Sequence, residues 1–223
     1  MKDTNLTWRY AKSLILGMML LWVIFHVLLF FPVPNTFKII SMIFAVIDII
    51  LMAFVFNFFR NPERHSAADE KSLLSPADGK VVAIEELVEN EILKVKMKRI
   101  AVFLNIFDVH VNRTPYAGKV THLTYTKGKF LNAMDPECSN QNERQLWVID
   151  KDGFVIAVRV IAGLIARRII PWREVGDELH RGDRIGIIKF GSRTELYVPM
   201  DCEVTVKVGQ RVKGGETVLA KRP

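Results

Sequence analysis

Two long apolar runs near the N-terminus constrain this chain most strongly. Residues 13–31 form an apolar run interrupted by His26, and residues 39–59 form a second one. Each has close to the ~20 residues that a helix needs to cross a bilayer. The Pro-Val-Pro-Asn joint at 32–35 is short and cannot continue a helix. The sequence therefore predicts a transmembrane hairpin over residues 1–59.

Two other interpretations of these runs are weaker. A cleaved signal peptide would be shorter, would be followed by a small-residue cleavage site, and would not be followed at once by a second apolar run. A pair of buried core helices would each keep a polar face, and neither run has one. The transmembrane interpretation is therefore preferred.

Basic residues predict the orientation of the hairpin. They flank its outer ends at Lys2, Arg9, Lys12, Arg60 and Arg64, whereas the loop between the spans carries only Lys38. By the positive-inside rule both ends are cytoplasmic. The rest of the chain is therefore expected on the cytoplasmic face of the inner (cell) membrane.

Two polar side chains lie inside the spans. Asp48 is mid-span, where a charge costs roughly 2.5–3.5 kcal/mol on insertion scales. His26 is expected at a similar depth on the other helix, given a rise of about 1.5 Å per residue. Our hypothesis is that the two side chains pair.

The net charge of +7 favours an anionic partner. Lipid and nucleic acid both fit such a charge, but no zinc-finger spacing or aromatic RNA-binding motif is present, so we favour a membrane lipid and expect no nucleic acid. Cys138 and Cys202 form no C-x-x-C pair and have no metal-ligand neighbours. They indicate a reducing compartment without a disulfide framework.

From Lys71 onward the chain consists of short β-type runs separated by Gly, Pro, Asn and Asp. Their spacing is close to the 8–12 residues that are typical of a barrel or sandwich. The expected strands are 80–84, 92–97, 100–103, 118–125, 146–149, 154–161, 184–190 and 194–198. The helical segment expected in this part is short, around 129–134.

An internal repeat refines this fold class. Residues 175–186 recur as residues 208–219 with the pattern V-G-x-x-[VL]-x-x-G-x-x-[VI]. The pattern resembles the strand–turn–strand unit of biotinyl/lipoyl-type barrel-sandwich domains, in which glycines make the turns. Neither copy has the lysine-bearing hairpin that carries biotin or lipoate. We expect a mainly β, barrel-sandwich domain over residues 60–223, preceded by the two-helix hairpin.

Three short segments carry residues that could do chemistry. They are Asp78 in an Asp-Gly turn, His110 in a strand-like run, and the pair Gly191-Ser192. Each alone is more often structural, as a turn or a hydrogen-bonded core histidine. Together they supply a carboxylate, an imidazole and a hydroxyl, which are the parts of an activated serine.

The order and content of several motifs resemble those of phosphatidylserine decarboxylases. The matching stretches are Phe-Arg-Asn-Pro-Glu-Arg at 59–64, Ser-Pro-Ala-Asp-Gly-Lys-Val at 75–81, residues 103–113, Asn-Glu-Arg at 142–144, residues 161–169 and residues 181–193. The similarity is greatest to the short form of the family, whose cleavage motif is Gly-Ser-Arg, here at 191–193. A preceding membrane hairpin is also familiar in short members.

The resemblance implies an enzyme that processes itself. Ser192 would attack the carbonyl of Gly191, the chain would be cut between residues 191 and 192, and Ser192 would become a pyruvoyl group. This group would form a Schiff base with the serine head group, release CO₂ and leave phosphatidylethanolamine. The resemblance further implies no metal, two fragments that stay associated, and a homo-oligomer as one possible state.

The resemblance also implies roles for other side chains. His110 would be the base for processing and a proton donor after decarboxylation, and Asp78 would orient it. Longer members have a second histidine where this chain has Arg113, so His110 must serve alone, with His180 as a reserve base. Candidates for the lipid phosphate, each equally well explained as solvated surface charge, are Arg167, Arg168, Lys127 and Lys129.

Three other functions share some of these sequence features. An archaetidylserine or related ether-lipid decarboxylase would share the head group and the site. A non-catalytic, membrane-tethered barrel-sandwich adaptor would explain the repeat and the hairpin, but not the three chemical segments. A zinc peptidase is disfavoured because the five histidines are scattered singly.

Overall fold

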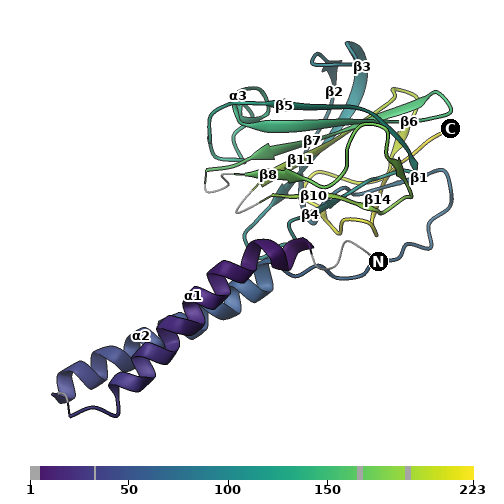
Figure 1. The fold of residues 1–223 in the computed structure, drawn as a ribbon. Helices are drawn as coiled ribbons and strands as arrows, with labels where there is room; N and C mark the ends of the chain where they lie inside the picture. The colour runs from purple at the N-terminus through teal and green to yellow at the C-terminus, as the bar shows by residue number, and fades with distance from the viewer. Residues whose placement is uncertain (1–5, 33, 165–167, 189–191) are drawn as a thin grey trace. The chain divides into compact units, whose positions relative to one another are not determined.

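The computed structural model describes residues 6–32, 34–164, 168–188 and 192–223. The chain divides into two compact units, residues 1–61 and residues 62–223. Figure 1 shows the helices α1 (Leu6–Leu28) and α2 (Asn35–Phe58) of the first unit and the β-rich second unit.

The first unit is a pair of packed helices, α1 and α2. Both are long and apolar enough to cross a membrane, with mean hydropathies of 1.7 and 2.8. The helices contact each other where Phe25 stacks on Phe44, with ring centroids 5.6 Å apart. Helix α1 begins earlier than the predicted span because no Pro or Gly interrupts its first turns. Helix α1 ends, and α2 begins, near the prolines of the joint.

The predicted pairing of His26 with Asp48 is not seen between the two described helices of the hairpin. His26 Nδ1 instead lies 3.0 Å from the carbonyl oxygen of Trp22, one turn earlier in the same helix. Because Phe25 stacks on Phe44, these two residues lie at the same level of the hairpin. His26 is one residue nearer the joint and Asp48 is four residues further from it, so about 7.5 Å separates them along the helix axes at a rise of about 1.5 Å per residue. Within the described residues, Asp48 Oδ2 is buried without a hydrogen-bond partner.

The second unit is mainly β, as expected. Its strands are β1 (Ser72–Leu74), β2 (Gly79–Glu89), β3 (Val95–Leu104), β4 (Val111–Arg113), β5 (Gly118–Thr126), β6 (Arg144–Lys151), β7 (Phe154–Ala162), β8 (Ile169–Pro171), β9 (Glu178–Leu179), β10 (Arg184–Ile188), β11 (Ser192–Val198), β12 (Glu203–Val204), β13 (Arg211–Val212) and β14 (Val218–Lys221). One short helix, α3 (Cys138–Gln141), lies between β5 and β6.

These strands form three antiparallel sheets. The largest has the order β13-β2-β3-β11-β7-β6-β5-β9, and the two smaller ones have the orders β1-β14-β12 and β4-β10-β8. The large sheet curves strongly in Figure 1. Its inner face carries a core of aliphatic side chains with Trp147 among them. Strand β11 lies between β3 and β7, and all seven of its residues are buried.

The two strands expected at 92–97 and 100–103 are one strand, β3. The first residues of the predicted strand belong to a turn instead, because the Glu89 carboxylate accepts hydrogen bonds from the backbone N–H groups of Glu91, Ile92 and Leu93. Lys94 then adopts a positive φ of 56° before the strand begins. A side-chain cap therefore overrides the local β propensity.

The helix expected around 129–134 is also wrong, since the described helix of this region is α3. Asn142 prevents a helix at the earlier position by bonding to both backbone groups of Leu131. Its Oδ1 accepts from the Leu131 N–H at 2.9 Å, and its Nδ2 donates to the Leu131 carbonyl at 2.9 Å. These bonds hold the segment extended beside residue 142.

The internal repeat predicted at 175–186 and 208–219 is present in the backbone. Its first glycines, Gly176 and Gly209, have φ of 101° and 92°, and its second glycines, Gly182 and Gly215, have φ of 86° and 77°. The first glycines make equivalent bonds, because Gly176 donates to the Val120 carbonyl and Gly209 donates to the Val81 carbonyl, both at 2.8 Å. The repeat therefore packs against two equivalent strands.

Those two strands begin with a second repeat. Residues 75–81 (SPADGKV) and 114–120 (TPYAGKV) share the pattern [ST]-P-x-x-G-K-V. In both copies the first hydroxyl donates to the carbonyl two residues later at 2.6 Å. Gly79 and Gly118 adopt φ of 149° and 152°, and an added Cβ would collide with the carbonyl oxygens of Phe103 and Asp150.

The second unit thus has an internal twofold relationship. It exchanges β2 with β5, β3 with β6, β11 with β7 and β13 with β9. Equivalent strands therefore lie at equal distances from the two edges of the large sheet. The two smaller sheets are exchanged with each other. In this twofold relationship, Ala117 is the residue equivalent to Asp78.

Candidate active site

Ser192 is the first residue of β11 and lies in the middle of the large sheet. Its cross-strand neighbours are Leu104 on β3 and Ala162 on β7. The residue is fully buried, and its Oγ has no hydrogen-bond partner among the described residues. Buried hydroxyls are usually hydrogen-bonded, so this orphan oxygen calls for a functional explanation. The predicted partner in cleavage, Gly191, lies outside the described residues.

His110 directly precedes β4 and is also fully buried. Its Nδ1 lies 2.9 Å from the carbonyl oxygen of Asp108. A proton on Nδ1 satisfies that oxygen and leaves Nε2 as the basic nitrogen. The His110 carbonyl accepts a hydrogen bond from the N–H of Ile188, the last residue of β10 and four residues before Ser192 in the chain.

A buried side-chain bond joins the segments of His110 and Ser192. Thr194 Oγ1 donates to Asn112 Oδ1 at 2.8 Å. Residues two apart on a strand share a face, so Ser192 lies on the face of Thr194. His110 is likewise two residues before Asn112. Sequence reasoning did not identify this bond, because neither residue belongs to a recognisable catalytic pattern.

Asp78 lies in the turn between β1 and β2. Its carboxylate accepts hydrogen bonds from an arginine and from a backbone N–H. Arg64 Nη1 and Nη2 donate to Oδ1 and Oδ2 at 2.5 and 2.7 Å, and the Gly214 N–H donates to Oδ1 at 2.8 Å. The Asp78 turn is connected to the His110 segment by a backbone bond, from the Arg113 N–H to the Pro76 carbonyl at 2.8 Å. The structure thus places the Asp78 turn against the strand that follows His110.

Arg113 cannot act as a base at neutral pH. Burial lowers its pKa to about 10, helped by repulsion from the neighbouring Arg184 and Arg64. The guanidinium is therefore still a cation near pH 7. It donates to the carbonyls of Gly182 and Pro62 at 2.9 and 2.8 Å, which is a structural role.

A largely apolar cavity of about 290 Å³ opens beside Ser192. Its lining includes Leu104, a cross-strand neighbour of Ser192. It also includes Gly163, which follows the other cross-strand neighbour, Ala162. The remaining lining residues are Phe103, Asn105, Ile106, Asn132, Ala133 and Leu164. Around it the apolar side chains of Phe107, Met134 and Leu164 are more than half exposed. We call these three residues the apolar rim.

Comparison with known proteins identifies the family of this chain. A sequence profile described as phosphatidylserine decarboxylase matches residues 51–220. A protein of Syntrophus aciditrophicus named phosphatidylserine decarboxylase proenzyme is 47% identical over 176 residues, covering 78% of this chain and 83% of its own. Proteins with the same name from Porphyromonas gingivalis and Syntrophotalea carbinolica are 44% and 42% identical, covering 83% and 85% of this chain and 86% and 92% of their own. The chain belongs to the phosphatidylserine decarboxylase family.

The decarboxylase family match includes Asp78, His110 and Ser192 and begins inside α2. The resemblance inferred from sequence motifs is therefore confirmed over the β-rich unit. The word proenzyme in the names of the relatives fits a chain that matures by processing. Helix α1 lies outside the matched residues.

Behind the cleavage motif of this decarboxylase family member lies a buried ionic cluster that the sequence did not reveal. The carboxylate of Glu195 is fully buried, with Arg193 Nε at 3.0 Å, Arg99 Nη1 at 3.3 Å and Arg159 Nη1 at 3.7 Å. It also accepts hydrogen bonds from Tyr197 Oη at 2.6 Å and Ser139 Oγ at 2.7 Å. Burial and the adjacent carboxylate raise the pKa of Tyr197, so the phenol stays protonated.

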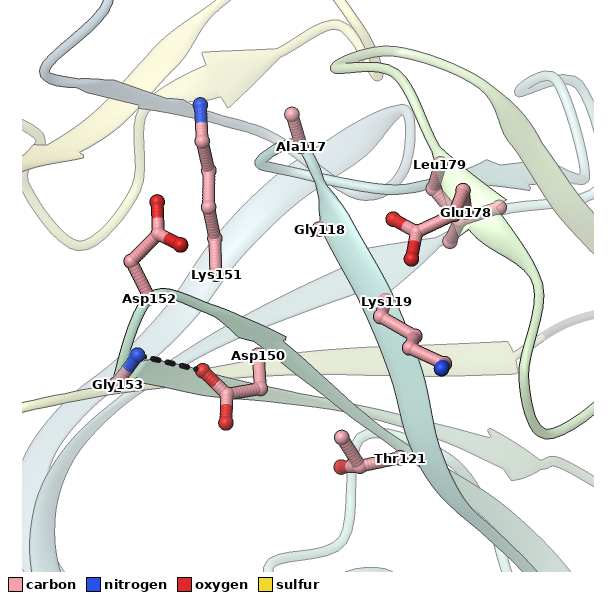
Figure 2. A pocket seen from close by; sticks show the side chains of 10 residues that line it. All are labelled: Ala117, Gly118, Lys119, Thr121, Asp150, Lys151, Asp152, Gly153, Glu178 and Leu179. Atoms are coloured by element: carbon pink, nitrogen blue, oxygen red, sulfur yellow. Dashed lines mark hydrogen bonds between the residues drawn. The ribbon is translucent and has the colours of Figure 1, made fainter.

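A larger cavity, of about 520 Å³, lies elsewhere (Figure 2). It is lined by both signs of charge, with Lys119 and Lys151 among Asp150, Asp152 and Glu178. It opens where the turn from β6 leads into β7, whereas Ser192 pairs with the opposite end of β7. Under the internal twofold relationship this cavity corresponds to the surroundings of Ser192. It lacks the equivalents of the catalytic candidates, since Ala117 replaces Asp78.

The other predicted site residues lie at the surface or outside the described chain. The His180 side chain is 94% exposed, and its ring lies 3.7 Å from Asp183, so it is remote from the buried site residues. Lys127, Lys129 and Arg168 are exposed, and Lys129 Nζ donates to Gln141 Oε1 at 3.0 Å. Arg167 lies outside the described residues. A phosphate-binding role for these cations stays a prediction.

Proposed function

We propose that this chain is a phosphatidylserine decarboxylase that makes its own catalytic group by cutting the bond between Gly191 and Ser192. One observation carries the proposal. In a member of this family, the serine of the Gly-Ser-Arg motif is fully buried, and its Oγ has no hydrogen-bond partner among the described residues. A hydroxyl that is dry and unpartnered is available for attack on the adjacent carbonyl.

The proposed cleavage has three steps, which are ester formation, elimination and hydrolysis. The Ser192 Oγ–H proton passes to a base as Oγ bonds to the Gly191 carbonyl carbon, and the C–N bond then breaks to leave an ester and a free amine. Loss of the Cα proton of residue 192 expels the Gly191 carboxylate and leaves a dehydroalanine. Water converts this residue to a pyruvoyl group and releases ammonia. His110 Nε2 is the base that we propose, because Nδ1 is committed to the Asp108 carbonyl.

The residues present fit a pyruvoyl group, which would stand where the orphan Ser192 hydroxyl now lies. The group would supply a carbonyl that accepts the serine amine and takes up electron density as CO₂ leaves. The apolar cavity beside Leu104 would exclude water from the reacting atoms. His110 would return a proton to the substrate carbon. We propose that Asp78 orients His110 and stabilises its charged form.

The position of β11 supports association of the two fragments after cleavage. The fragment 192–223 would contain β11, β12, β13 and β14. Strand β11 hydrogen-bonds to β3 and β7, β13 to β2 and β14 to β1, all from the larger fragment. We therefore propose a stable two-fragment enzyme of the barrel-sandwich type.

The apolar helices support a membrane location. We propose that α1 and α2 cross the inner membrane as a hairpin, with the β-rich unit on the cytoplasmic face. The substrate class is a membrane phospholipid. Its head group would enter the cavity beside Ser192 while the apolar rim contacts acyl chains.

Intact-mass analysis of the purified full-length chain tests this function. We expect two fragments, 1–191 and 192–223, with the second beginning at a residue that lacks a free amine. Ser192→Ala should remain one chain and release no CO₂ from phosphatidylserine. A wild-type chain that stays whole, or a Ser192→Ala chain that is still cut at this bond, would refute the proposal.

A further inference from the structure

The segment 62–64, which follows α2 after three residues, is fixed on the β-rich unit by arginine contacts. Arg113 Nη2 donates to the Pro62 carbonyl at 2.8 Å. Arg184 Nη2 donates to Glu63 Oε1 at 2.8 Å. These bonds fix the backbone and the one exposed side chain of the segment. The third residue, Arg64, reaches inward.

Arg64 forms a two-pronged ion pair with Asp78. Nη1 and Nη2 meet Oδ1 and Oδ2 at 2.5 and 2.7 Å, and the two side chains are 8% and 13% exposed. Arg64 Nη1 also donates to the Gly214 carbonyl at 2.9 Å, while the Gly214 N–H donates to Asp78 at 2.8 Å. Such a fork fixes both the position and the direction of a carboxylate.

The internal twofold relationship shows that the fold does not need this pair. Ala117 occupies the position of Asp78 in the other half. The surrounding backbone bonds are equivalent, because the Gly215 N–H donates to the Ser75 carbonyl at 2.8 Å and the Gly182 N–H donates to the Thr114 carbonyl at 3.0 Å. The turn therefore forms equally well without a carboxylate. The charge at Asp78 has a purpose other than the architecture of the turn.

The Asp78 turn is mechanically linked to the processing site. The Pro76 carbonyl accepts the N–H of Arg113 in β4, and β4 begins directly after His110. The His110 carbonyl in turn accepts the N–H of Ile188, four residues before Ser192. A shift of the Asp78 turn is therefore transmitted to the base and to the scissile segment.

We infer that Arg64 is a positioning residue for self-cleavage, acting through Asp78. This inference rests on the proposed function. Arg64, which follows the second apolar helix, is then a component of the processing machinery. Cleavage depends on the ion pair between Arg64 and Asp78, which fixes the direction of the Asp78 carboxylate.

To test this, full-length chains are newly synthesised into membranes. The amounts of uncut chain and of fragments, identified by mass, are then measured over time. We expect Arg64→Gln to slow cleavage on the order of 10- to 100-fold, as misplacement of a catalytic group does. Arg64→Lys should recover part of that loss, because it keeps the charge and loses the fork. The double variant Arg64→Gln, Asp78→Asn should be no slower than Asp78→Asn alone. Glu63→Gln is the matched control, since it breaks only the neighbouring ion pair, and it should cleave like the wild type.

The outcomes separate the inference from the proposed function. If the wild type never cleaves, the proposed function fails. If the wild type cleaves and Arg64→Gln cleaves as fast, the inference is overturned while the function stands. A double variant that shows the multiplied losses of the two single variants would also overturn it, because Arg64 would then act independently of Asp78. Equal slowing by Glu63→Gln would assign the effect to general attachment of the segment and reject the specific role of Arg64.

Discussion

Thr194 Oγ1 donates a hydrogen bond to Asn112 Oδ1, and this buried bond joins strands β11 and β4, which belong to different sheets. Each partner lies two residues after a catalytic candidate, Ser192 in one strand and His110 in the other. The two side chains are separated by 82 residues in sequence. The bond therefore fixes how the strand of Ser192 and the segment of His110 are aligned.

Thr194→Val should weaken this alignment without changing side-chain volume much. The buried Asn112 Oδ1 would lose its donor, at a cost of about 1–3 kcal/mol in the free energy of unfolding, and cleavage should slow. Thermal unfolding is measured in a Ser192→Ala background so that every chain stays uncut. Thr205→Val, which removes an exposed hydroxyl bonded to the Val218 carbonyl, is the control. Unchanged cleavage in Thr194→Val would show that the bond does not align the site.

Glu195→Gln should destabilise the β-rich unit strongly. The carboxylate is fully buried within 4 Å of three arginines, and its loss leaves buried positive charge without compensation. Breaking a buried ion pair typically costs about 3–5 kcal/mol. Urea unfolding of uncut Ser192→Ala chains checks this. A variant as stable as its parent would show that the cluster is solvated in solution.

Leu164→Asp tests the apolar rim. The side chain is 68% exposed in the structure, and burying a leucine in lipid contributes about 1.5 kcal/mol or more, so KM for vesicle-bound phosphatidylserine should rise roughly tenfold. Self-cleavage precedes substrate binding and should continue in this variant. Val175→Asp, at a similarly exposed position in the repeat, should leave KM unchanged. An equal rise in both variants would remove the rim as a lipid-contacting surface.

The two thiols should be unreactive in the folded chain. Burial raises the pKa of Cys202 to about 11, with Asp201 adding to the effect, and burial raises the pKa of Cys138 as well. An unfolded thiol ionises near pH 9, so the folded state loses stability as the pH rises from about 9 to about 11. Iodoacetamide labelling at pH 8, read by mass, should modify neither cysteine until urea is added. Rapid labelling of Cys202 in the native chain would contradict its burial.

Most residues of the candidate site could be proposed from the sequence, because they lie in short, local patterns. Gly-Ser at 191–192, the Asp-Gly turn and the lone His110 were identified from residue type and order. The repeat glycines were also identified, since a positive φ is a local requirement that glycine meets. The orphan state of the Ser192 hydroxyl, in contrast, depends on packing from β3 and β7.

The contacts that hold the site could not be predicted in the same way. Arg64 meets Asp78 across a loop, and Glu195 collects arginines from β3, β7 and β11. Such partners are fixed by the order of strands in the sheet, which no local pattern specifies. One signal was present and unused. The repeated [ST]-P-x-x-G-K-V at 75–81 and 114–120 predicts the twofold relationship and distinguishes Asp78 from Ala117.

The central place of β11 has a consequence for the life of the molecule. An intact chain can unfold and refold, because one backbone connects every strand. If the bond before Ser192 is cut, as we propose, the strand between β3 and β7 belongs to a separate peptide of 32 residues, 192–223. Refolding then requires two pieces to find each other, at a rate set by their concentration. We expect the mature enzyme to persist because it unfolds slowly. Its chain folds as one piece only before the cleavage.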